Sequence, residues 1–302
     1  MNKDKVLLEI KNVNKSFPVD SIDYEKRRIK VLADISFKVK AGEIVALVGP
    51  SGCGKTTLLN IIAGLLSADK GEVNLLGNHK IQANLESSDE SISDSTIEKE
   101  DSSFRKKTKN EGNSKIEEEN KDKIKNKPKK NHKMAYIFQE PRLLPWMTVD
   151  RNIAFVQENF LPQQEAEEIR RELLARAGLK DFANSYPAQL SGGMKQRLEF
   201  IRALSIKPGL LLMDEAFKSL DISLKLRLQD LLLDIYEKDR FSILFITHNP
   251  EDAVMLADRI FILNDNPGKI VHIFEIKIPR SERNLKNEDI YNKLQEILEI
   301  IS

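Results

Sequence analysis

The sequence has almost no net charge, one cysteine and no long apolar run, and each absence excludes a class of protein. Its 48 basic and 47 acidic residues leave a formal charge of +1, so no global field attracts nucleic acid or an anionic bilayer. Cys53 alone cannot form an intrachain disulfide, which favours a reducing compartment. No stretch approaches the roughly 18 to 20 apolar residues that span a bilayer. We therefore expect a folded cytoplasmic protein, and any membrane part of its function must come from another chain.

The apolar pattern predicts an α/β fold with one main core. Alternating residues at 6–10 and 31–39 are typical of strands in a small antiparallel layer. Continuous apolar runs predict buried strands at 44–48, 210–213 and 243–247, and helical spacing predicts helices at 57–66, 165–177, 192–204 and 222–237. Because helices separate the buried strands, we expect a mainly parallel core sheet with covered faces.

One segment interrupts this pattern within what we expect to be a single domain over residues 1–302. Residues 82–133 contain mostly Ser, Glu, Asp, Lys and Asn, with few aliphatic side chains to bury, and they predict a disordered charged insertion. Its acidic residues come first and its lysines follow. Two interpretations stay open, a solvated surface excursion or a docking site for anionic lipid headgroups or another protein.

A phosphate-binding loop follows the strand at 44–48. The segment fits the pattern G-x-x-x-x-G-K-[ST] between a buried strand and a helix, and its residues with the next threonine are Gly49, Pro50, Ser51, Gly52, Cys53, Gly54, Lys55, Thr56 and Thr57. Glycines let backbone N–H groups point at phosphate oxygens, and the helix N-terminus adds positive potential. We expect Lys55 to reach the β- and γ-phosphates and the Thr56 hydroxyl to ligate Mg²⁺. Cys53 is expected to be a small neutral filler.

Two further strands end in residues suited to nucleotide hydrolysis. The run at 210–213 is followed by Asp214 and Glu215, and ligands of open parallel sheets bind beyond the carboxyl ends of strands. Asp214 is placed to hold Mg²⁺ through water, and Glu215 to orient and deprotonate an attacking water. His248 closes the strand at 243–247, so the same geometry aims it at the γ-phosphate.

A second glycine-rich segment resembles the signature of ABC-type ATPases. Leu190-Ser191-Gly192-Gly193 is followed by Met194 where the family usually has glutamine. Ser191, Gly192 and Gly193 begin a helix and form another anion-binding N-terminus. The resemblance implies a P-loop NTPase of the ABC ATPase type, with a mainly parallel core sheet, a small antiparallel β layer and a helical subdomain. It also implies that this segment grips ATP held by a second ATPase subunit.

The resemblance assigns roles to further single positions. Phe17 is similar to the aromatic residue that stacks on adenine, although Tyr24 in the following loop stays an alternative. Gln139 resembles the glutamine that joins the Mg²⁺ and water site to the helical subdomain, expected at 139–190. Asp221 resembles the aspartate that reports across the dimer, and His248 the histidine beside the γ-phosphate.

The segment after Gln139 narrows the resemblance. Residues 138–146, Phe-Gln-Glu-Pro-Arg-Leu-Leu-Pro-Trp, together with 267–270 and 278–280, resemble importer ATPases for nitrate, sulfonate and taurine. Leu143, Leu144 and Trp146 are expected either to form an exposed groove for a membrane subunit or to pack inside the helical subdomain. Three departures from the family stand out, Ala216 for a proline, Phe217-Lys218-Ser219 for Phe-Gly-Ala, and Glu199 for a small residue.

These observations predict an ATP-binding and hydrolysing subunit at the cytoplasmic face of the membrane. Its expected partners are a second ATPase subunit, transmembrane permease subunits and, indirectly, a solute-binding protein, with no nucleic acid. An exporter or lipoprotein-release ATPase shares every ATP-site residue and stays an alternative, as does a soluble non-transport ABC ATPase. The tail at 281–302 has an apolar helical stripe that is expected to dock on its own domain or to contact the second subunit.

Overall fold

The computed structural model describes residues 5–19, 27–75, 80–81, 133–218 and 220–301. The predicted insertion at 82–133 lies outside these ranges except for Lys133. The Lys133 carbonyl accepts a hydrogen bond from the N–H of Gly209 at 2.7 Å, so this lysine belongs to the folded unit and not to the insertion. The chain divides into a unit of residues 1–83 and 132–302, which contains all the described residues, and a second unit of residues 84–131.

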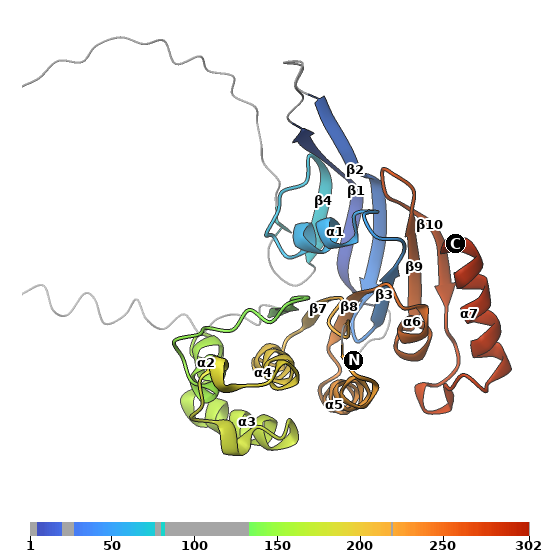
Figure 1. The fold of residues 1–302 in the computed structure, drawn as a ribbon. Helices are drawn as coiled ribbons and strands as arrows, with labels where there is room; N and C mark the ends of the chain where they lie inside the picture. Colours follow the sequence, from blue (N-terminus) through green and yellow to red (C-terminus); the bar gives the residue numbers. More distant parts are fainter. Residues whose placement is uncertain (1–4, 20–26, 76–79, 82–132, 219, 302) are drawn as a thin grey trace, which may run out of the picture. The chain divides into compact units, whose positions relative to one another are not determined.

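Two sheets stack in this unit (Figure 1). The antiparallel sheet has the spatial order β2 (Arg27–Lys40), β1 (Val6–Val19), β4 (Lys70–Leu75) and β5 (Lys80–Ile81). The second sheet has the order β10 (Lys269–Glu275), β9 (Arg259–Asn264), β3 (Ile44–Val48), β8 (Ser242–Thr247), β7 (Leu210–Asp214) and β6 (Met134–Ile137). Its neighbouring strands from β9 to β6 pair in parallel, and only β10 runs antiparallel. The expected fold class is confirmed.

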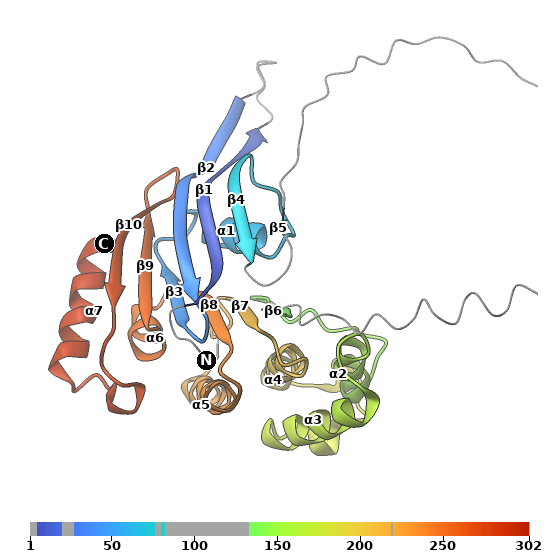
Figure 2. The same ribbon diagram turned by 180° about the vertical axis from the view of Figure 1, so that it is seen from behind.

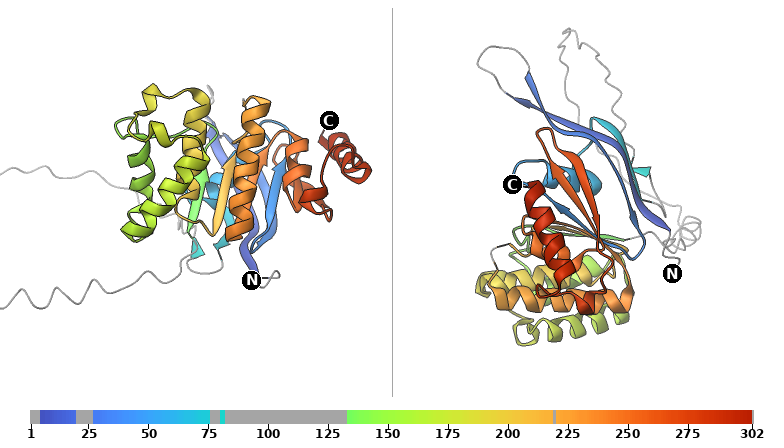
Figure 3. Two further views of the ribbon diagram at one scale, coloured as in Figure 1. Left: turned by 90° about the horizontal axis from the view of Figure 1, so that it is seen from below. Right: turned by 90° about the vertical axis from the view of Figure 1, so that its right-hand side faces the viewer.

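Helices lie on the side of the parallel sheet that faces away from the antiparallel sheet (Figure 2). They are α2 (Val149–Gln157), α3 (Gln163–Arg176), α4 (Gly192–Leu204), α5 (Ile222–Asp239), α6 (Pro250–Leu256) and α7 (Glu288–Ile301), with short 3₁₀ turns at Lys180–Phe182, Pro187–Gln189 and Arg280–Glu282. Figure 3 shows α4, α5, α6 and α7 side by side across that face, while α2 and α3 pack beyond α4. Helix α1 (Lys55–Ile62) lies between the two sheets, so the strands are apolar on both faces.

Local chemistry explains where the site-bearing helices begin. Ser191 and Asp221 precede α4 and α5, and each accepts a hydrogen bond from the N–H three residues later. Helix α1 begins at Lys55, two residues before the predicted start, because Gly54 takes a left-handed φ of 97° and turns the chain directly into the helix. Helix α1 also ends at Ile62 and not at Leu66, since Gly64 turns the chain with a φ of 72°.

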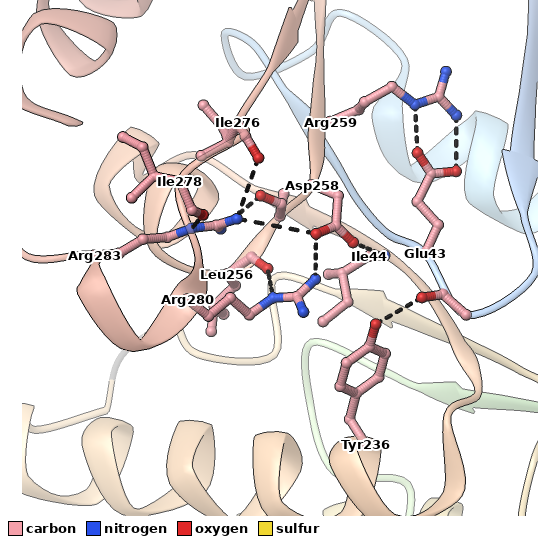
Figure 4. A network of polar contacts seen from close by, with 12 residues as sticks. Glu43, Ile44, Tyr236, Leu256, Asp258, Arg259, Ile276, Ile278, Arg280 and Arg283 are labelled. Carbon is pink, nitrogen blue, oxygen red and sulfur yellow. Dashed lines mark hydrogen bonds and ion pairs between the residues drawn. The ribbon is translucent and has the colours of Figure 1, made fainter. Parts of the chain in front are cut away.

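The tail docks on its own unit, as the first of the two alternatives predicts. Ile290, Leu294 and Ile297 of α7 are buried in the core beneath α6 and β9. Arg283 anchors the segment that leads into α7, because its buried guanidinium donates to the backbone carbonyls of Val254, Met255, Ala257, Ile276 and Ile278 (Figure 4). Burial and the neighbouring Arg280 lower the pKa of Arg283 to about 10, so the guanidinium keeps its charge at neutral pH.

Candidate nucleotide site

The phosphate loop has the geometry that its glycines predict. Gly52 and Gly54 take φ values of 86° and 97°, where side chains are strained. Gly49 is required for another reason, because a Cβ there would lie 1.9 Å from the carbonyl oxygen of Leu263 in β9. The loop is also closed from below by Gly268, where a Cβ would lie 2.0 Å from the Cys53 carbonyl. These close approaches fix the loop against β9 and against the turn that leads from β9 to β10.

Lys55 lies inside this loop. Its ammonium donates to the carbonyls of Gly49 at 2.9 Å and Pro50 at 2.8 Å, and its side chain is buried. Buried ammonium groups need such acceptors, and an anion within the loop would offer stronger ones. Cys53 is also buried, and desolvation raises the pKa of its thiol despite the nearby Lys55 charge. Cys53 therefore fills space as a neutral thiol, as expected.

Thr56 and Asp214 meet at the end of the sheet. The Thr56 hydroxyl donates to Oδ1 of Asp214 at 3.1 Å, and Oδ2 lies 3.5 Å from the Tyr136 hydroxyl. Burial is the main cause that raises the pKa of Asp214, the Thr56 hydrogen bond opposes it, and the charge of Glu215 adds to it. A hydroxyl and a carboxylate oxygen side by side are hard ligands that fit Mg²⁺, which keeps several waters and takes phosphate oxygens as its other ligands.

Glu215 lies one residue beyond β7 and faces His248. Parallel pairing of β7 with β8 brings these two strand ends together, and the Glu215 N–H donates to the Ile246 carbonyl at 3.1 Å. Oε2 of Glu215 is 3.8 Å from Nδ1 of His248 and 2.5 Å from Nζ of Lys218. Glu215 takes a φ of 45°, a strained conformation for a non-glycine residue that is typical of functional sites. The carboxylate and imidazole together can accept and hold a proton beside a bound phosphate.

Gln139 shares a cleft with the metal ligands proposed from the sequence. The cleft has a volume of about 340 Å³ and is lined by Thr56, Asp214 and Gln139, together with Tyr136 and Arg142. Gln139 itself is exposed, two residues beyond the end of β6. The structure therefore brings the ends of β6 and β7, the start of α1 and the glutamine segment to one opening.

The signature segment lies elsewhere in the described unit. Ser191 caps α4, and a Cβ at Gly193 would lie 2.8 Å from Leu224 of α5. Asp221 caps α5, and hydrogen bonds from the Ser223 hydroxyl and the Leu224 N–H lower its pKa. Among the described residues no hydrogen bond or ion pair joins Ser191, Gly192 or Gly193 to the phosphate loop.

Phe17 lies on β1, opposite Ile29 of β2. Two residues along β2, Val31 lies against the position of Gly54, so Phe17 is near the phosphate loop. The Lys15 ammonium lies 5.4 Å from the Phe17 ring centroid. Tyr24, the alternative aromatic residue, lies outside the described residues.

The apolar segment after Gln139 is divided between the two interpretations. Trp146 is 69% exposed, whereas Leu143 packs against the core and Leu144 is half-buried. Leu143 therefore agrees with the second interpretation, packing inside the fold, and Trp146 with the first, exposure at the surface. Asn152, fully buried, holds the loop by bonding both the N–H and the carbonyl of Leu144, which fixes Trp146 at the surface.

Sequence reasoning missed two residues at the opening. Tyr136, on β6, places its hydroxyl 3.1 Å from Oδ1 of Asn60, and burial and the charge of Asp214 raise the pKa of the phenol. A tyrosine within an apolar strand is a signal that could have found it, since a buried phenol needs a polar partner. Lys218, noted only as a departure from the family, proves to be the ion-pair partner of Glu215.

Comparisons with known proteins agree with this geometry. A family model described as ABC transporter matches residues 32–120 and 103–218. An aliphatic sulfonates import ATP-binding protein of Xanthomonas axonopodis pv. citri is 37% identical over 253 residues, which are 83% of this chain and 82% of that protein. A bicarbonate transport ATP-binding protein of Synechococcus elongatus is 33% identical over 93% of this chain and 35% of that protein.

A solved structure shares the fold. It is the dimeric post-hydrolysis state of an ATP-binding cassette bound to ADP and Pi, with a TM-score of 0.65, 26% identity, and coverage of 90% of this chain and 100% of that one. The resemblance to sulfonate-type importer ATPases is thereby confirmed alongside the fold class. The chain belongs to the ABC transporter family.

Proposed function

We propose that this chain is the ATP-hydrolysing subunit that powers an ABC importer for small solutes of the sulfonate, nitrate or taurine kind. One observation carries the proposal, namely that Thr56, Asp214, Glu215 and His248 gather from three segments at the carboxyl end of the parallel sheet, beside the phosphate loop. The names of the sulfonate and bicarbonate relatives support the importer class.

The phosphate loop holds the nucleotide in this proposal. Lys55 exchanges its two carbonyl acceptors for phosphate oxygens, and backbone N–H groups from Gly49 to Thr57 point at the same anion. Phe17 supplies a flat apolar face for the adenine. Thr56, Asp214 and Gln139 hold Mg²⁺, which when bound neutralises charge that develops on the phosphates.

Glu215 is the general base for the attacking water. Its carboxylate accepts the proton of that water after it separates from Lys218, and His248 fixes the carboxylate from the other side. His248 is half exposed, so its imidazole can also hydrogen-bond to a terminal phosphate. In this proposal Glu215 and His248 handle the proton of the attacking water, and the phosphate loop positions the nucleotide.

A second copy completes the site. The signature at Ser191–Gly193 forms an N-terminus that suits phosphate, and within the described ranges no hydrogen bond or ion pair joins it to its own phosphate loop. We infer that it faces a nucleotide held by another subunit, with Asp221 at the same junction. The dimeric neighbour supports this pairing. Within the described ranges, no helix has the length and apolar character needed to cross a bilayer. We propose that permease subunits bind at the exposed Trp146, at the cytoplasmic face of the membrane.

The test is ATPase activity of the full chain with its co-encoded membrane partner. Glu215→Gln should keep ATP binding and lower turnover by about 10² to 10⁴. Glu288→Gln, an exposed carboxylate on α7, is the matched control and should behave as wild type. Stimulation by one binding protein loaded with sulfonate, nitrate or a pyrimidine would name the cargo class. Normal turnover in Glu215→Gln would overturn the hydrolytic role, and Glu215-dependent turnover that ignores every binding protein would favour an exporter.

A further inference from the structure

A fully buried carboxylate on α4 faces the segment that carries Gln139. Glu199 has no exposed surface, and its Oε2 accepts from Nη2 of Arg202 at 2.5 Å. The other arm of the same guanidinium donates to the Arg142 carbonyl at 2.7 Å. Glu199 and Arg202 therefore form a buried pair that reaches from α4 to the loop after β6.

The second oxygen of this carboxylate is unusual. Oε1 of Glu199 is buried and has no hydrogen-bond partner. Burial is the main cause that raises the pKa of Glu199, and it is opposed by Arg202 and by the N–H groups of Arg142 and Phe138, which approach the carboxyl. An unpaired buried acceptor destabilises the fold, so its presence calls for a role beyond packing.

The loop contacted by this pair leads directly to the nucleotide opening. The Arg142 guanidinium lies over the Phe138 ring at 3.9 Å, and that ring stacks on Tyr136 with centroids 4.2 Å apart. The Tyr136 hydroxyl in turn lies 3.5 Å from Asp214. Gln139 sits within this stacked segment, between Phe138 and Arg142, and lines the same cleft as Asp214.

Helix α4 is also connected to two other segments of the proposed catalytic site, the signature and the segment after Glu215. Its N-terminal cap is Ser191 of the signature, and the buried Gln196 donates to the Ala216 carbonyl at 2.9 Å, one residue beyond Glu215. Glu199 lies three residues after Gln196 and so points from a neighbouring turn of the helix. The helix thus bonds to the signature, the Glu215 segment and the Gln139 segment.

We propose that Glu199 is a positioning residue that fixes the Gln139 segment, residues 138–142, against the signature helix α4. The inference rests on the role proposed above for Gln139. The charge of the carboxylate is needed because its Oε2 holds the Arg202 guanidinium, whose other arm donates to the Arg142 carbonyl. An amide in its place pairs with this guanidinium less strongly through its oxygen and cannot pair with it through its NH₂ group.

A double-mutant cycle between Glu199 and Gln139 tests the proposal in the full-length protein. Glu199→Gln should lower kcat by roughly three- to thirtyfold and raise the Mg²⁺ concentration for half-maximal activity, with little change in the KM for ATP. In a Gln139→Ala background the same substitution should change kcat less than twofold, because the group that it positions is gone. If Glu199→Gln does not fold, Glu199→Asp, which keeps the charge but shortens the reach, serves in the same cycle.

The matched control is another buried carboxylate with an arginine partner. Glu43 precedes β3, at the strand end away from the phosphate loop, and pairs with Arg259 (Figure 4). Glu43→Gln should lower the melting temperature but leave the Mg²⁺ dependence unchanged, with an effect independent of Gln139. Equal kcat factors for Glu199→Gln in both backgrounds would overturn the positioning role. Normal turnover in both Gln139→Ala and Glu215→Gln would instead overturn the proposed function.

Discussion

The ammonium of Lys218 lies 2.5 Å from Oε2 of Glu215, three residues earlier in the chain. Members of the ABC family usually have a glycine at the position of Lys218, so this ion pair is a feature of this chain. The Lys218 side chain is 39% exposed, whereas Glu215 is largely covered. Glu215, the proposed general base, is thus paired with a lysine that solvent and ions can reach.

Lys218→Ala should raise turnover by about 1.4- to fivefold. The ion pair must separate before the carboxylate can turn to an attacking water, and partly exposed pairs are worth about 0.2–1 kcal/mol. The measurement is kcat against ionic strength, since salt weakens the pair in the wild type and should have little effect on the variant. A fall in kcat would show that Lys218 helps to hold Glu215 in its working position.

Thr56→Ala should weaken the activation of the ATPase by Mg²⁺ by about ten- to hundredfold. The hydroxyl is one of the three protein groups proposed to hold Mg²⁺, and a second, the Asp214 carboxylate, loses its hydrogen-bond partner as well. Thr56→Ser keeps the hydroxyl and is the matched control. The test is a titration of activity with Mg²⁺ at fixed ATP, and equal curves for the two variants would contradict the metal role.

Asp69 gives the fold an acid-sensitive contact. Partial burial acts to raise its pKa, but the Ser16 N–H at 2.6 Å and the cations of Lys15 and Arg28 outweigh it, so the pKa lies below the ordinary 3.8. A carboxyl with a lowered folded pKa stabilises the fold above its unfolded pKa, and this stability is lost as pH falls through the folded value.

Asp69→Asn should therefore lower the free energy of unfolding by about 1 kcal/mol at pH 7, and the difference should shrink below pH 4. Urea midpoints at several pH values measure this difference. Glu165→Gln removes one exposed carboxylate paired with Lys207 and should change the midpoint much less. A difference that persists unchanged at pH 3 would show that shape, and not charge, makes the contact.

Arg283→Met should lower the free energy of unfolding by about 3 kcal/mol, because it leaves several buried carbonyls without a donor. For a domain of this size that corresponds to a fall of roughly 6–12 °C in melting temperature. Arg280→Met, at a more exposed position in the same network, should cost less. Equal melting temperatures for the two variants would contradict the anchoring role.

Local sequence patterns predicted the elements whose signals are local. Strand β3 and helix α4 begin and end where predicted, because one is a continuous apolar run and the other has a serine cap and a regular stripe. The strands β9 and β10 and the short helices α2 and α6 were not predicted. Part of the reason is that β9 pairs in parallel with β3, which lies far away in the sequence.

In the candidate site, too, the residues in local motifs were predicted and the contacts between distant residues were not. Lys55, Thr56, Asp214 and Glu215 stand in short motifs whose chemistry and spacing point to phosphate and metal. The contact of Tyr136 with Asp214 joins residues 78 positions apart, and no local pattern encodes that distance. In the sequence Glu199 stood out only because the family usually has a small residue there. The role proposed for it depends on its connection through Arg202 to Arg142, which only the tertiary structure shows.

After β5 the chain leaves the edge of the antiparallel sheet, and at β6 it enters the parallel sheet, again at an edge. β5 is the last strand of the antiparallel sheet and β6 the last of the parallel sheet, so the connection between residues 81 and 133 joins two edges. The strands that carry the phosphate loop and Glu215 lie inside the parallel sheet and are continuous. Because loop closure free energy grows only slowly with length, this junction can gain or lose residues without changing the register of the catalytic strands, which makes it a suitable place for a reporter domain.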